Sequence, residues 1–211
     1  MNEFEIDSYI EKLASNKNVK SFYPIAICKM LKFPIKLVIN RLNKLVNMGY
    51  LKLKFEIRCD NFDIMDIVDS YEDYLGKNIE CEDCDSVTEF VIGLENIFPI
   101  YYINDNYREY IKKKNVCLQV QEKLNCNQIS TGNYDSTLNT PTSLKDIILE
   151  NTSVSSDSIE EANNKIKKKG IVDKAKNVQV VLTLVNTIHQ SWEWLEPYIQ
   201  PLVHHISDFI K

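Results

Sequence analysis

The first 58 residues carry the pattern that most constrains how this chain can fold: three segments with helical spacing, followed by one alternating segment. The first segment places apolar residues on one helical face, at Phe4, Ile6, Ile10 and Leu13. The second covers about residues 22–31, and Pro34 then suits the first turn of a third helix. The third runs to Gly49, a residue that commonly ends helices. Residues 50–58 alternate apolar and charged side chains, which predicts a half-buried strand.

Two helices joined by a tight turn, the second of them amphipathic, are the sequence requirement of a helix-turn-helix. Residues 23–51 meet this requirement and end in Asn-Met-Gly-Tyr-Leu before the predicted strand. This ending resembles the recognition helix and wing of bacterial winged-helix regulators, over roughly residues 5–58. The resemblance implies a winged helix-turn-helix domain at residues 1–58, a fold that usually binds DNA and sometimes binds protein.

The third helical segment is the one that such a domain places in the major groove of DNA. The predicted contacts on it are Lys36, Asn40, Arg41, Asn43 and Lys44, with Lys52 and Lys54 on the following strand. Arg and Asn side chains can read guanine and adenine with two hydrogen bonds each, whereas the lysines would contact phosphates. Two alternatives are that these are ordinary solvated charges, or that the domain recognises a protein.

Charge divides the chain into regions of opposite sign. Residues 1–58 contain eleven Lys and Arg against five Asp and Glu, whereas residues 59–105 contain thirteen Asp and Glu and a single Lys. The formal net charge of the whole chain is −5, a poor balance for a protein that simply coats nucleic acid. The asymmetry predicts two surfaces with different partners and an acidic module at residues 59–116.

Six cysteines stand at positions 28, 59, 81, 84, 117 and 126. The N-terminus has no apolar signal-peptide region, so we expect a cytoplasmic protein whose clustered thiols serve metal or redox chemistry. Cys81 and Cys84 form a Cys-x2-Cys pair, and Cys59 begins a second tetrapeptide that ends in Phe62 instead of cysteine. The spacing resembles a zinc ribbon, in which two such pairs supply four tetrahedral ligands.

Three interpretations of this ribbon-like module are open. In the first, zinc binds Cys59, Cys81, Cys84 and a carboxylate such as Asp60 or Asp63. In the second, which the missing cysteine favours, the ribbon is degenerate and metal-free, with Phe62 filling the site and the thiols buried. In the third, Cys81 and Cys84 form a redox pair, although the adjacent acidic residues should raise the thiol pKa values and reduce reactivity.

The second half of the chain predicts a linker and a helical tail. Residues 125–158 are rich in Asn, Ser and Thr, which indicates a polar linker with short helices over residues 117–170. In residues 171–211 apolar side chains recur at steps of three or four, which indicates an amphipathic helical segment. The residues assigned to oligomerisation are Leu184, Ile188, Trp192, Leu195, Ile199, Leu202 and Ile206. Attachment to a membrane surface and packing within the chain are the alternatives.

No catalytic constellation is visible. The chain lacks a Gly-rich phosphate loop, and its histidines lie only at positions 189, 204 and 205. We therefore expect a protein that is not an enzyme. The expected fold class is mainly α with small β elements, comprising the winged helix, a small ribbon-like α/β module and a C-terminal amphipathic helix.

The function that this layout predicts is a winged-helix DNA-binding regulator that acts as a dimer or higher oligomer. The alternative is a protein-interaction adaptor or effector, of the kind found in bacterial defence systems, whose C-terminal helix oligomerises or acts at a membrane.

Overall fold

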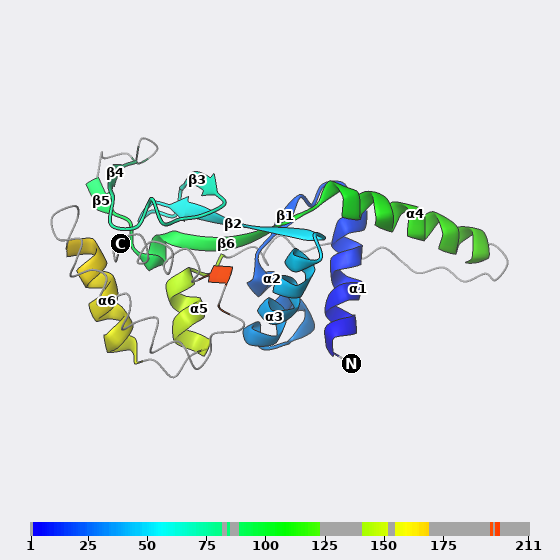
Figure 1. Ribbon diagram of the computed structural model, residues 1–211, viewed down its shortest axis with the longest axis horizontal. Coiled ribbons are helices and arrows are strands. Elements are labelled where there is room, and N and C mark those ends of the chain that lie inside the picture. Colours follow the sequence, from blue (N-terminus) through cyan, green and yellow to red (C-terminus); the bar gives the residue numbers. More distant parts are fainter. Residues whose placement is uncertain are drawn as a thin grey trace, which may run out of the picture. The chain divides into compact units, whose positions relative to one another are not determined.

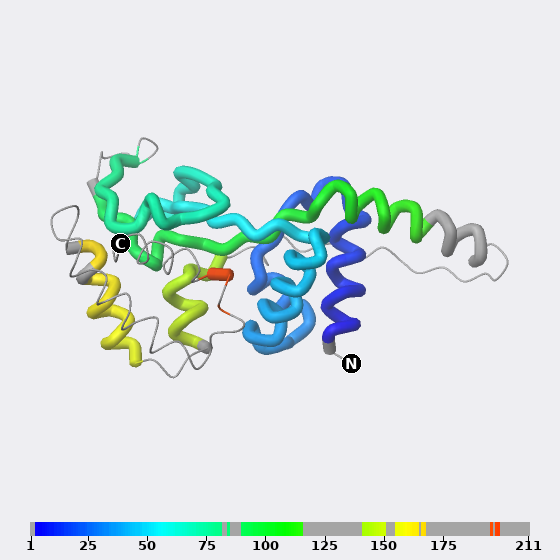
Figure 2. The backbone as a smooth tube through the Cα atoms, in the orientation of Figure 1, coloured from blue at the N-terminus to red at the C-terminus, as the bar shows by residue number. Residues whose placement is uncertain are grey.

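A computed structural model of the protein describes residues 2–81, 84, 89–122, 141–151, 155–168, 195, 197 and 198 (Figure 2). The chain divides into two compact units. Unit 1 consists of Met1–Lys52 and Tyr101–Thr140, and unit 2 consists of Leu53–Ile100 and Pro141–Lys211. The segment Leu53–Ile100, called the inserted segment below, therefore interrupts unit 1 in the sequence.

Unit 1 begins with three helices and a two-residue strand. These elements are α1 (Asn2–Ser15), β1 (Ser21–Phe22), α2 (Pro24–Leu31) and α3 (Ile35–Asn47). Pro24 opens α2, where the missing backbone N–H costs no helical hydrogen bond. Gly49 ends α3 in the left-handed conformation at φ +75°, and Tyr50 N–H donates to the Leu45 carbonyl to close the helix end.

The helices of unit 1 pack around one apolar core. Helices α1, α2 and α3 contact one another, and α4 (Asp105–Glu122) packs against α1 (Figure 1). The core side chains are Ile6, Ile10, Leu13, Ile27, Val38, Ile39, Leu42, Leu45, Tyr101 and Ile111. Strand β1 pairs in antiparallel fashion with Tyr101 and Tyr102 at the end of β6 (Ile97–Ile103). This pairing fixes the chain that leads into α4.

The described residues of unit 2 include the strand pairs β2–β3 and β4–β5 and the helices α5 and α6. Strand β2 (Leu51–Arg58) pairs with β3 (Ile64–Val68), and β4 (Asn78–Glu80) pairs with β5 (Glu89–Val91). The short 3-10 helix η1 (Leu94–Asn96) contacts α5 (Leu144–Asn151), which also contacts α6 (Ser156–Lys168). A Cβ atom at Gly93 would lie 2.6–2.8 Å from side-chain atoms of Glu95, Asn163 and Lys167, so any larger residue there would require these side chains to shift.

The expected fold class is wrong, because the β structure is more than a small element. Strands run in the order β1-β6-β2-β3 in one four-stranded antiparallel sheet, and 53% of the described residues are helical against 21% in strands. The fold is therefore mixed α/β. Of the described strands, the sequence analysis predicted only β2, and the longest strand that it missed is β6, an apolar run without alternation that contains Pro99. Proline argues against a central strand, but β1 pairs only with Tyr101 and Tyr102 and does not extend to Pro99.

Among the described helices, none is both long enough and apolar enough to cross a membrane.

Candidate metal centre and nucleic-acid interface

The metal-centre candidate starts in the loop that joins β2 to β3. Cys59 N–H donates to the Asp63 carbonyl at 3.0 Å, and Phe62 N–H donates to the Cys59 carbonyl at 2.9 Å. Phe62 adopts the left-handed conformation at φ +69°. A three-residue hairpin loop commonly ends in such a left-handed residue. Here this conformation turns the backbone so that Asp63 lies directly opposite Cys59.

This turn decides which side chain joins the cysteines. The Phe62 side chain points away and is 63% exposed, with its ring edge-on to Phe98 at 6.1 Å between centroids. The next residue, Asp63, lies against Cys59, and its backbone N–H donates to the Cys59 Sγ atom at 3.3 Å. Phe62 therefore lies outside the thiol cluster, contrary to the metal-free interpretation that placed its ring there.

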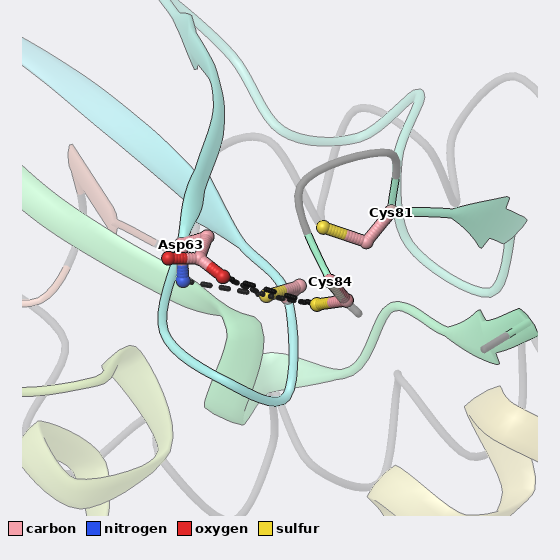
Figure 3. Close-up of side chains that lie close together, drawn as sticks. Asp63, Cys81 and Cys84 are labelled. Atoms are coloured by element: carbon pink, nitrogen blue, oxygen red, sulfur yellow. Dashed lines mark hydrogen bonds between the residues drawn. The ribbon is translucent and has the colours of Figure 1, made fainter. Parts of the chain in front are cut away.

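The loop after β4 supplies the other two cysteines. Cys81 is buried, whereas Cys84 is partly exposed. The ligand atoms of Cys59, Asp63, Cys81 and Cys84 all lie within 4.8 Å of one another. Figure 3 shows the Asp63 carboxylate and the Cys81 and Cys84 sulfur atoms directed toward a common space. These four residues could hold a metal ion.

The spacings among the ligand atoms of Cys59, Asp63 and Cys84 fit a tetrahedral ion. The Cys59 and Cys84 sulfur atoms are 3.7 Å apart, and Asp63 Oδ2 is 3.7 Å from Cys59 Sγ and 3.8 Å from Cys84 Sγ. Zinc–sulfur bonds of about 2.3 Å and zinc–oxygen bonds of about 2.1 Å place tetrahedral ligands roughly 3.8 Å and 3.6 Å apart, respectively. These three ligand atoms thus already lie near the spacing that such an ion requires, and Cys81 Sγ lies within 4.8 Å of each of them.

The electrostatics of the cluster oppose a free thiolate. The hydrogen bond with Cys81, burial and the neighbouring Cys59 together raise the pKa of the Cys84 thiol to about 12. The Asn61 amide, with Nδ2 3.2 Å from Cys84 Sγ, acts in the opposite direction. A cation bound among these groups would favour the deprotonated thiols, because metals bind the thiolate form.

Of the two carboxylates considered as a fourth ligand, only Asp63 belongs to the cluster. Asp60 instead accepts a hydrogen bond from the Asn96 amide at 3.0 Å. Asn61 was not identified from the sequence, since nothing in its position indicates that its amide would reach a cysteine 23 residues later.

On α3, the predicted DNA contacts divide into exposed residues and residues engaged within unit 1. Lys36, Asn40 and Lys44 are exposed, together with Asn47 at the end of the helix. Steps of four, four and three residues place them in one stripe along a single helical face. Lys44 Nζ also lies 2.6 Å from Glu3 of α1, in an ion pair at the surface.

Arg41 and Asn43 have partners inside unit 1. The Arg41 guanidinium binds Asp7 at 2.6 and 2.7 Å and Glu3 at 3.2 Å, which leaves its side chain 14% exposed. Asn43 is 8% exposed, and its Oδ1 atom accepts a hydrogen bond from the Tyr101 hydroxyl at 3.0 Å. These two side chains connect α3 to α1 and to β6, respectively.

The two predicted DNA contacts on β2 also comprise one exposed residue and one residue with a partner within the chain. Lys52 is exposed, whereas the Lys54 ammonium lies 3.1 Å from the Asp69 carboxylate. Ion pairs at a surface are weak, so Lys54 can still exchange this partner for a phosphate.

Of the predicted oligomerisation residues, only Leu195 lies within the described residues. It is fully buried, and nearby Tyr198 packs edge-on to Phe55 and accepts a hydrogen bond at its backbone oxygen from Tyr71. Here the tail packs inside unit 2. Oligomerisation through the other six residues stays a prediction, since all of them lie outside the described residues.

No family model, curated protein or solved structure matches this chain. The predictions of a winged helix and a zinc ribbon therefore rest on the chain's own element order and ligand geometry.

Proposed function

We propose that this chain is a winged-helix DNA-binding protein that contacts duplex DNA through unit 1 and holds its inserted segment together with a zinc ion. The observation that carries the proposal is the single exposed stripe of Lys36, Asn40, Lys44 and Asn47 on α3. In this assignment α3 is the recognition helix.

The element order supports the assignment. Helices α1, α2 and α3 are followed by β2, and β6 lies between β1 and β2 in the sheet. Strands β2 and β6 would then be the two strands of the wing. The metal-centre candidate lies in the segment between them, so the long acidic insertion takes the place of a short wing loop.

The chemistry of the stripe favours contacts dominated by phosphates. Phosphate binding, which depends strongly on salt concentration, suits two lysines on α3, Lys36 and Lys44, and Lys52 on β2. Asn40 is the exposed side chain among the predicted contacts that can read a base, by two hydrogen bonds to adenine. We therefore expect modest sequence preference that depends on Asn40.

Binding of a fluorescent duplex at several salt concentrations tests this proposal. Lys52→Ala should weaken binding to all duplexes and lower the salt slope by about one, because one phosphate contact is lost. Asn40→Ala should relax sequence preference at one position, at a cost of about 1–3 kcal/mol for the preferred duplex. Lys113→Ala is the matched control, since Lys113 is an exposed lysine on α4. Absence of binding at low salt, or equal loss with Lys113→Ala, would contradict duplex binding through α3.

The ligand set favours zinc over other common ions. Three thiolates and one carboxylate form a mainly soft set, which suits zinc better than calcium or magnesium. The four ligands come from two separate hairpin loops within the inserted segment. An ion bound there would join these loops, which is the role of a structural zinc site.

The fourth ligand can be tested with a pair of neighbouring aspartates. Asp63→Ala should weaken zinc binding by at least about 10-fold, because a direct ligand matters at least as much as the groups around it. Asp60→Ala should leave zinc affinity unchanged, since Asp60 binds Asn96 instead. Competition titration with a chromogenic zinc chelator measures both affinities. Equal affinities for the two variants would show that Asp63 is not a ligand.

Recognition of a protein is the second candidate function, and one observation favours it. Arg41 and Asn43, two of the side chains best suited to reading bases, are engaged within unit 1. Failure of duplex binding together with zinc-dependent stability of the inserted segment would favour this candidate.

A further inference from the structure

We propose that the zinc site is a hydroperoxide-sensitive switch, in which oxidation joins Cys59 to Cys84 by a disulfide and releases the ion. This inference rests on the proposed zinc site and adds a means of regulating it. It is carried by the distances and the unequal exposure of the three cysteines.

Cys84 is the sulfur that an oxidant reaches first. Cys59 and Cys81 are each 3% exposed, whereas Cys84 is partly open to solvent. The Asn61 amide donates a hydrogen bond to Cys84 Sγ at 3.2 Å. This contact orients the sulfur at the edge of the cluster and leaves one side of it accessible.

Cys59 is placed to react with an oxidised Cys84. The two sulfur atoms are 3.7 Å apart, so a disulfide of about 2.05 Å requires them to approach by about 1.7 Å. They lie on different hairpin loops, the first joining β2 to β3 and the second following β4. The bond would therefore link two loops that the zinc ion otherwise holds together.

The reaction is balanced with hydrogen peroxide as the oxidant. The Cys84 thiolate attacks one peroxide oxygen, the O–O bond breaks, and a sulfenic acid forms while the other oxygen leaves as water after protonation. The Cys59 thiolate then attacks the Cys84 sulfur, the S–S bond forms, and the S–O bond breaks to release a second water. Two thiolates, one peroxide and two protons thus give one disulfide and two waters, with the peroxide reduced by two electrons.

Loss of two thiolates leaves Cys81 and Asp63 as ligands from this cluster. Structural zinc sites in proteins are almost always four-coordinate, so two ligands do not retain the ion. A thiol reductant regenerates both thiolates, after which added zinc binds again.

The experiment uses the full chain loaded with zinc and treated with increasing hydrogen peroxide. Zinc release is followed with a chromogenic chelator, and the disulfide is located by mass spectrometry of proteolytic peptides without reduction. We expect the amount of zinc released to rise in proportion to the amount of a cross-linked peptide pair that contains Cys59 and Cys84. Zinc binding should recover after treatment with dithiothreitol. Cys28→Ser is the matched control, because Cys28 is a buried cysteine outside the cluster, and this variant should release zinc as the unmodified chain does.

The outcomes separate this inference from the proposed zinc site. Zinc that is bound at the start and retained after peroxide would overturn the switch and leave the zinc site standing. Release with a Cys81–Cys84 bond, or with sulfinic acid that dithiothreitol does not reduce, would overturn it in the same way. A chain that binds no zinc before oxidation would overturn both.

Discussion

Replacement of Cys81 by serine should leave the chain without bound zinc and should destabilise the inserted segment. Cys81 is buried, and its sulfur is one of the four clustered ligand atoms. A serine hydroxyl does not ionise at neutral pH and does not replace a thiolate on zinc. At a free zinc concentration of a thousand times Kd, bound zinc contributes about 4 kcal/mol to the free energy of unfolding, and the variant should lose this amount. Elemental analysis and urea unfolding with and without added zinc measure the two effects.

A chelator provides a second, independent way to obtain the zinc-free chain. Removal of zinc from the unmodified chain should shift its urea unfolding midpoint to that of Cys81→Ser, whereas the variant should not respond to chelator. Cys28→Ser should keep one zinc ion per chain, because Cys28 lies outside the cluster. If Cys81→Ser still carries one zinc per chain, or if chelation does not change the stability of the unmodified chain, a structural zinc site is excluded.

The helices and the first long strand were predictable because their signals are local. The predicted helices near the N-terminus are confirmed as α1, α2 and α3, and the alternating segment is confirmed as β2. Each of these elements buries one face, so the apolar period appears directly in the sequence. Gly49 and Pro34 mark the boundaries for equally local reasons, since they concern the backbone of single residues.

The sheet was not predictable in the same way. Strand β6 is buried at nearly every position, so it shows no alternation, and its neighbours in the sheet, β1 and β2, end at least 39 residues before it begins. Strand β1 has only two residues, too few for any period. Pairing over such separations depends on tertiary packing, which a single-sequence pattern does not contain.

The sequence did not specify the details of the candidate sites that depend on a backbone conformation or on a partner distant in the sequence. A spacing rule assigns the second ligand to position 62, but the left-handed turn at Phe62 brings in Asp63 instead. Arg41 satisfies every sequence criterion for a DNA contact, yet its partner Asp7 lies 34 residues earlier in the chain. Helical periodicity identifies the exposed face of α3 but not which of its cations are paired.

Arg108→Ala should destabilise unit 1 by about 2–4 kcal/mol, because it removes hydrogen bonds from a charged group to three backbone carbonyls. The Arg108 guanidinium donates to the Ala14 and Asn16 carbonyls at 3.2 and 3.0 Å, and also to the Val19 carbonyl. These carbonyls belong to the last turn of α1 and to the turn that follows it. A cation at this C-terminal end also interacts favourably with the negative end of the helix dipole. Asp105 is almost fully exposed and 4.0 Å away, so the carbonyls are the stronger partners.

The chain divides into two compact units, and a single unfolding midpoint does not show which of them is destabilised. Hydrogen exchange of the α1 and α4 amides does locate it, and we expect about 30-fold or greater loss of protection in Arg108→Ala, which corresponds to about 2 kcal/mol. Lys113→Ala changes an exposed cation on the same helix and should stay within about 0.5 kcal/mol of the unmodified chain. Arg108→Lys should recover little, because one ammonium cannot reproduce the planar fork that reaches all three carbonyls. Equal protection in Arg108→Ala and Lys113→Ala would mean that the apolar contacts of α4 with α1, and not the arginine, hold the end of α1 in place.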